Sequence, residues 1–187
     1  MQHTAGWAGL GAGLLFFLAG CSVPQVADYR MERPAIDIVS YFSGDVDGSG
    51  MFQDRSGRVV KRFHVAMHGE WHDGELVLQE HFVYSDGSLQ QRVWHIQRGT
   101  GASVLGTAGD VVGVAHGEQA GNALHWVYDL ELPVGTHTLK VAMNDWMFQQ
   151  DQSTVLDITD MSWWGIHLGH LTLVMHRRGA SACSCNH

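Results

Sequence analysis

The chain has 187 residues and a net charge of −8, with 11 Lys and Arg against 19 Asp and Glu. This acidic balance argues against nucleic acid as a partner and against electrostatic attraction to anionic lipid. The length is sufficient for one domain with a substantial core.

The first element is an apolar run from Trp7 to Ala19 that ends at a cysteine. It is shorter than the roughly 20 apolar residues that cross a bilayer, and it is typical of a secretory signal peptide. Leu18-Ala19-Gly20-Cys21 resembles a bacterial lipoprotein processing site, where cleavage precedes the cysteine and the cysteine is acylated. We expect a removed signal peptide over 1–20, then a lipidated Cys21 and tether over 21–35. A plain signal peptide with a chance cysteine is the alternative.

The residue after the cysteine bears on location. It is Ser22, whereas an Asp there would signal retention at the inner membrane. By resemblance to Gram-negative sorting rules, we expect the acyl chains on Cys21 to hold the protein at the periplasmic face of the outer membrane. At the other end, 179–187 is expected to be a disordered tail. Its Cys183 and Cys185 could be free, form an intermolecular disulfide or contact a metal.

Between these ends the sequence alternates between apolar and polar residues, the signature of half-buried strands. In 59–72 the odd positions are mostly apolar and the even positions polar. Turn signals such as Asp73-Gly74 and Asp86-Gly87 separate the segments. The predicted strands are 40–45, 50–55, 58–71, 75–84, 89–98, 102–107, 111–117, 123–132, 136–147 and 167–177. Residues 149–163 are interpreted as a weak strand or a loop, and no long helix is predicted.

This pattern predicts an all-β fold, an antiparallel up-and-down β-barrel of about eight to ten strands over 36–178. Closure would remove the exposed sheet edges, and a barrel of this size can hold one small ligand. A ten-stranded outer-membrane barrel is the competing interpretation, but it needs a lipid-facing apolar row on every strand.

Two charged residues interrupt the apolar rows of one predicted hairpin. A three-residue turn at 85–87 places Glu80 opposite Arg92. Burying a charge is costly unless it is paired, so we predict an inward ion pair between them. The pair could be structural and set the strand register, or it could orient a ligand, for example a carboxylate on Arg92.

Aromatic residues on the same faces complete a candidate site, although such residues more often only pack a core. The candidate ligand-binding residues are Glu80, Phe82, Tyr84, Arg92, Trp94, Trp126, Tyr128 and Trp146. His64, His68 and His72 share a strand face, but four residues of strand span about 13 Å, too far for one metal ion. We expect no metal, no cofactor and no catalytic motif.

Several motifs together resemble a family of uncharacterised proteobacterial lipoproteins, known as a domain of unknown function. They are the lipobox, Tyr41-Phe42-Ser43-Gly44, Glu80-x-Phe82-x-Tyr84-x-Asp86-Gly87, Arg92-x-Trp94, Asp110-Val111-x-Gly113, Asp145-Trp146-Met147 and Gly165-Ile166-x-Leu168-Gly169. The resemblance covers nearly all of 36–178. It implies a calycin- or lipocalin-like barrel and a link to lipid metabolism, but it assigns no activity, and a fold alone does not give one.

Three functions remain open at this point. The first is a lipid-binding module that holds a fatty acyl chain or another apolar ligand in the barrel. The second is a structural or assembly lipoprotein with a filled barrel that acts through protein partners. The third is a lipid-modifying enzyme with Glu80, Asp145 or a histidine as acid or base, which we consider the weakest because no recognisable catalytic arrangement accompanies these residues.

Overall fold

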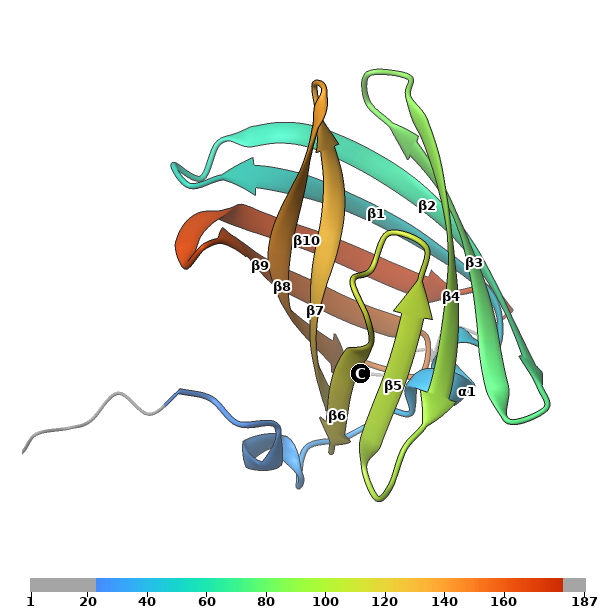
Figure 1. Ribbon diagram of the computed structural model, residues 1–187. Coiled ribbons are helices and arrows are strands. Elements are labelled where there is room, and N and C mark those ends of the chain that lie inside the picture. Colours follow the sequence, from blue (N-terminus) through green and yellow to red (C-terminus); the bar gives the residue numbers. More distant parts are fainter. Residues whose placement is uncertain (1–22, 180–187) are drawn as a thin grey trace, which may run out of the picture.

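The computed structural model describes residues 23–179 and folds them into a closed sheet of ten antiparallel strands (Figure 1). Each strand pairs with the next along the chain, and the first pairs with the last. The strands are β1 (Gly44–Asp54), β2 (Val59–His72), β3 (Glu75–Tyr84), β4 (Leu89–Arg98), β5 (Ser103–Ala108), β6 (Ala115–Ala120), β7 (Ala123–Val134), β8 (His137–Gln149), β9 (Thr154–Trp163) and β10 (Ile166–Arg177). The predicted up-and-down barrel is therefore confirmed.

The alternation of apolar and polar residues determines which face of each strand is buried, as expected. On β2, Phe63, Val65 and Met67 are buried, and the residues between them face solvent. The β2–β3 hairpin turns at Asp73 and Gly74, whose φ angles of 50° and 87° are those of a tight two-residue turn. Local alternation and turn chemistry thus set the inward faces.

One end of the barrel is plugged by a short helix, α1 (Ile38–Phe42), which corrects the predicted strand over 40–45. The Asp37 carboxylate caps it by accepting a hydrogen bond from the Ser40 backbone N–H at 3.1 Å. The Tyr41 hydroxyl donates to the carbonyls of Ser153 and Met175, each at 3.0 Å. These bonds fix the helix against the ends of β9 and β10.

Two further predictions need correction. Most of 149–163, interpreted as a weak strand or a loop, forms the regular strand β9, which is paired with both β8 and β10. The strand predicted over 111–117 begins later, at Ala115, because 109–114 forms a loop that folds onto β7. For 111–117, an apolar run flanked by glycines, periodicity alone does not distinguish a strand from a loop.

The expected tether is partly packed on the barrel. Within it lies a 3₁₀ helix, η1 (Val26–Tyr29), in which Val26 is buried. Tyr29 packs edge-on against Trp146 and Phe148, with ring centroids 5.8 and 5.2 Å apart. Cys21, the predicted lipidation site, lies outside the described residues, as do residues 180–187.

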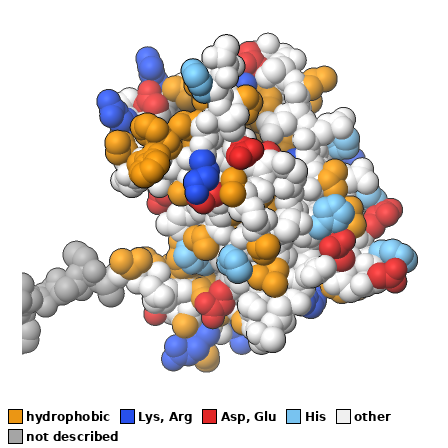
Figure 2. Space-filling model, viewed as in Figure 1, with side chains coloured by type: hydrophobic (Ala, Val, Ile, Leu, Met, Phe, Trp, Pro, Cys, Tyr) orange, Lys and Arg blue, Asp and Glu red, His pale blue; other side chains and the backbone are white. Residues whose placement is uncertain are grey.

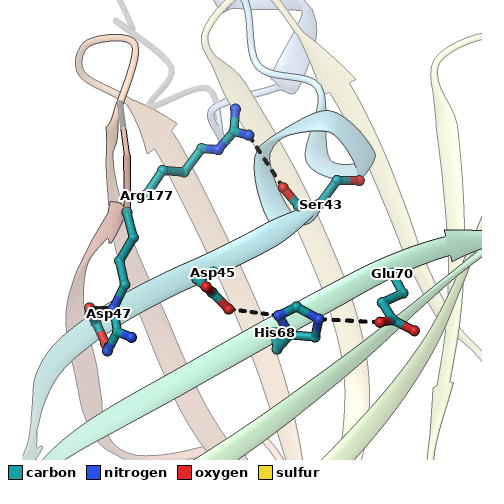
Figure 3. A network of polar contacts seen from close by, with 7 residues as sticks. Ser43, Asp45, Asp47, His68, Glu70 and Arg177 are labelled. Atoms are coloured by element: carbon teal, nitrogen blue, oxygen red, sulfur yellow. Dashed lines mark hydrogen bonds and ion pairs between the residues drawn. The ribbon is translucent and has the colours of Figure 1, made fainter. Parts of the chain in front are cut away.

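Polar contacts tie the outer face together around β1. The imidazole of His68 bridges Asp45 and Glu70, at 2.6 and 3.4 Å, and Arg177 donates to the Ser43 carbonyl across the β1–β10 junction (Figure 3). Over the face shown in Figure 2, charged and histidine side chains are interspersed with hydrophobic ones. None of the helices within 23–179 is long and apolar enough to cross a bilayer.

The close approach of α1 to β2 gives a first prediction. A Cβ at Gly69 would overlap the Phe42 carbonyl oxygen, so Gly69→Ala forces the plug to move. We expect it to lower the free energy of unfolding by about 1–3 kcal/mol in urea titrations, as overpacking does. Gly109→Ala, where a Cβ meets nothing within 4 Å, is the control and should shift stability by less than about 0.5 kcal/mol. Equal stabilities for the two variants would show that the plug does not constrain β2.

Candidate functional site

The barrel encloses a cavity of about 90 Å³ between the α1 plug and the middle of the strands. Ile38 and Phe42 of α1 contribute to its wall, together with aliphatic residues of β4 and β10. Buried polar side chains from β3, β4, β8 and β9 line another part of the same cavity. The site is therefore mixed in character, with an apolar part and a charged part.

The charged part includes an ion cluster at Arg92. Glu80 and Arg92 are directly opposed in the β3–β4 register, and Arg92 Nη1 lies 3.5 Å from Glu80 Oε2. Their side chains are only 12% and 13% exposed. Arg92 also forms a bidentate ion pair with Asp110. Its Nε lies 3.0 Å from both carboxylate oxygens, and its Nη2 lies 2.8 Å from Oδ2. The predicted inward Glu80–Arg92 pair is confirmed, and Asp110 is its third member.

Asp110 reaches Arg92 from the loop over 109–114. The loop is held against β7, because the Glu131 N–H donates to the Asp110 carbonyl at 2.8 Å and the Val112 N–H donates to the Asp129 carbonyl at 2.9 Å. Two backbone hydrogen bonds thus position the carboxylate that binds the guanidinium most tightly.

Burial shifts the acid–base balance of this cluster. Desolvation raises the pKa of Glu80 to about 7, although the positive charge of Arg92 opposes the shift. Burial would lower the pKa of Arg92, but the Glu80 charge and the Asp110 hydrogen bonds outweigh it and raise the pKa. Arg92 is therefore a permanent cation, whereas Glu80 changes charge near neutral pH.

A second carboxyl pair lies on the neighbouring strands. Asp145 and Asp157 are buried, 4% and 5% exposed, and the Thr159 hydroxyl donates to Asp157 Oδ1 at 3.1 Å. Burial, reinforced by the charge of Asp145, raises the pKa of Asp157 well above its usual range. Burial also raises the pKa of Asp145, and a hydrogen bond from Asp157 opposes that shift. Burial therefore favours the neutral form of both carboxyls, more strongly for Asp157.

Two buried oxygens in this site lack a donor among the described residues. Glu80 Oε2 and Asp145 Oδ1 accept no hydrogen bond, although Glu80 Oε2 is within ion-pair range of Arg92. Arg92 is the one Lys or Arg in the described cavity wall, and Asp110 already occupies it. The earlier interpretation of Arg92 as a carboxylate receptor is therefore disfavoured, because the site has an excess of acceptors.

The structure brings most of the predicted site residues together. Those that line the cavity are Glu80, Phe82, Arg92, Trp94, Trp126 and Tyr128. Tyr84 lies outside the cavity wall, with its hydroxyl donating to Gln90 Oε1 at 2.6 Å. The placement of Trp146 was wrong: it stacks on His125 on the outer face, at 4.3 Å between ring centroids. Asp145 and Met147 face inward, and alternation turns the residue between them outward.

Asp110, Asp157 and Thr159 were absent from the predicted site. A signal for Asp157 was present, because it interrupts the inward row between Val155 and Thr159 as Glu80 does on β3. It was overlooked because this segment was not recognised as a regular strand. Asp110 had no such signal, since its position depends on how the loop folds.

Histidines on the outer face have partners of their own. His64 and His68 contact Ser49 and Asp45, at 2.9 and 2.6 Å. At the β9–β10 end, Asp160, His167 and His170 place one ligand atom each within 4.8 Å of one another. His170 Nδ1 already lies 2.6 Å from Asp160 Oδ1, so a polar contact within the chain accounts for two of the three groups.

The ten strands thus form a closed antiparallel barrel around a cavity with an apolar part and a charged part. The chain belongs to the DUF3833 family, described as proteins of unknown function, whose sequence profile matches residues 15–177. Its fold is similar to that of the S-type phycobiliprotein lyase CPES from Guillardia theta, with a TM-score of 0.58 and 6% identity, over 84% of this chain and 99% of that one. No curated protein matched the chain.

The buried Glu80 gives a second prediction. A carboxyl whose pKa is higher in the folded state binds its proton more tightly there, so its contribution to stability is lost as pH rises from about 4.5 to about 7. Relative to wild type, Glu80→Gln should gain up to about 3 kcal/mol of unfolding free energy between pH 4 and pH 8. Urea titrations at both pH values measure it. Glu118→Gln, at an exposed position, should show no such gain, and a pH-independent difference for Glu80→Gln would contradict the assignment.

Proposed function

We propose that this protein is a ligand-binding barrel of the bacterial cell envelope that holds one end of a small amphipathic molecule, such as a lipid. The observation that carries the proposal is the mixed wall of one cavity, where Trp94 and Trp126 meet the buried charges of Glu80, Arg92 and Asp145. Binding pockets typically combine an apolar lining with a few convergent polar groups.

The energetic cost of the polar groups supports this function. A buried ion pair is often no more stabilising than apolar residues of the same volume. This barrel buries Asp145 and Asp157 and leaves the side chains of Glu80 and Arg92 only 12% and 13% exposed. Clusters of buried groups with shifted pKa values occur preferentially at functional sites.

The cavity volume restricts what the site can hold. Pockets for drug-sized ligands measure about 300–1,000 Å³, and this one measures about 90 Å³. It accommodates a head group and a few carbon atoms, and a longer acyl chain needs flexible side chains such as Met147 and Met175 to move. The same volume favours the second candidate, a structural barrel with a filled interior.

Membrane attachment is the second part of the proposal. Acyl chains on Cys21 would tether the barrel to the periplasmic face of the outer membrane. An exposed apolar hairpin tip supports contact with a bilayer: Trp164 is 89% exposed, beside Trp163 and Ile166. Tryptophan is well suited to the interface between water and lipid.

Native mass spectrometry of the full chain, released from membranes in a mild detergent, tests the binding function. We expect a discrete added mass that denaturation releases as a lipid-like molecule. Leu171→Trp, which fills the cavity, should remove that mass. The matched variant Val174→Trp, on the outer face at a position 37% exposed, should keep it. An unliganded mass that persists after incubation with extracted cell lipids would favour the filled barrel.

Metabolic labelling tests the anchor separately. Expressed in a Gram-negative host with an alkyne-tagged fatty acid, the chain should incorporate label and fractionate with membranes. Cys21→Ser should abolish the label, because the other two cysteines lie in the polar C-terminal tail. The control, Cys183→Ser combined with Cys185→Ser, should label as wild type does. Labelling that survives Cys21→Ser would remove the basis for the anchor.

A further inference from the structure

We propose that the cavity selects a ligand whose polar end is a protonated amine, bound between the Glu80 and Asp145 carboxylates. This inference rests on the proposed binding function and adds the chemistry of the ligand's head group. Both side chains line the same cavity from β3 and β8. Each has one fully buried oxygen that accepts no hydrogen bond from the described residues.

Unpartnered acceptors define what the ligand must supply. Leaving a buried polar atom without a hydrogen bond costs about 1–3 kcal/mol, and more when the group is charged. An alkylammonium carries three N–H donors on one atom and no acceptor. It carries enough donors for both Glu80 Oε2 and Asp145 Oδ1, whereas a carboxylate ligand would add further acceptors.

The charge of the site also favours a cationic ligand. Arg92 is already neutralised by the two-pronged contact with Asp110 and the ion pair with Glu80. Arg92 is the one Lys or Arg in the described cavity wall, so no second one faces Asp145. A cationic ligand restores the balance, and an anionic one worsens it.

The apolar part of the cavity accounts for the rest of the ligand. Leu78, Trp94 and Trp126 line it, along with Leu173 and Met175. An alkyl group attached to the nitrogen would contact these side chains while the nitrogen faces the carboxylates. A primary amine with a short alkyl chain is therefore the minimal probe for the site.

The experiment compares three probes with the same six-carbon chain, n-hexylamine, 1-hexanol and hexanoate, on the full chain at pH 8 in one detergent. At this pH the amine is protonated and the acid is ionised. Trp94 and Trp126 line the cavity, so tryptophan fluorescence reports binding. We expect n-hexylamine to bind at least 10-fold more tightly than 1-hexanol, and hexanoate to bind more weakly than either.

Charge-removing variants then locate the contact. Glu80→Gln and Asp145→Asn keep the side-chain volume, and each should weaken hexylamine binding about 10-fold and hexanol binding by much less, because the alcohol carries no charge. Glu118→Gln, at an exposed position, should change neither. The comparison of probes on wild type stands even if one variant fails to fold.

Each contrary result has a distinct meaning. Equal affinity for hexylamine and hexanol would overturn the amine proposal and indicate that water satisfies the two oxygens, with the binding function intact. Preference for hexanoate would overturn it in favour of an acid ligand. If no probe binds while native mass spectrometry shows a bound lipid, the head-group assignment alone fails. If neither experiment shows a ligand, the proposed function fails with it.

Discussion

The arrangement of the barrel interior depends on the bidentate ion pair between Arg92 and Asp110. It holds a guanidinium inside the barrel by joining strand β4 to the loop over 109–114, which is itself bonded to β7. With Glu80 on β3, the same side chain connects three separate parts of the wall. A buried charge that loses its partners is far more costly than a missing apolar contact. The loop, the two strands and the charge state of the cavity are therefore constrained together.

The α1 plug gives this cluster its surroundings. Its Ile38 and Phe42 close the cavity on one side, so the carboxyls lie at the boundary between an apolar end and the middle of the barrel. Burial raises the pKa of Glu80 to about 7 and also raises the pKa values of Asp145 and Asp157.

Local patterns explain what could be predicted. Strand positions and the opposition of Glu80 to Arg92 depend only on alternation and on one hairpin turn, and both were recoverable from sequence. The helix at 38–42 was not, because a five-residue apolar run fits either a helix or a strand. The approach of Asp110 to Arg92, and the shared cavity of Glu80 and Asp145, depend on a loop and on barrel closure. These two features are set by tertiary structure, so no local periodicity in the sequence reveals them.

The charges also change the chemical interpretation of the site. From sequence, an inward arginine suggests a receptor for an acid, because Arg is the usual partner of a carboxylate. In the folded chain that partner is supplied internally by Asp110, so the guanidinium acts as part of the wall. The atoms left without a hydrogen bond among the described residues are two acceptors, Glu80 Oε2 and Asp145 Oδ1. A site of this kind discriminates strongly, since a ligand without donors leaves its buried polar atoms unpaired, whereas apolar contacts separate similar ligands only weakly. Under the proposed binding function, specificity would be determined by the carboxylates of Glu80 and Asp145, and affinity by the aromatic lining.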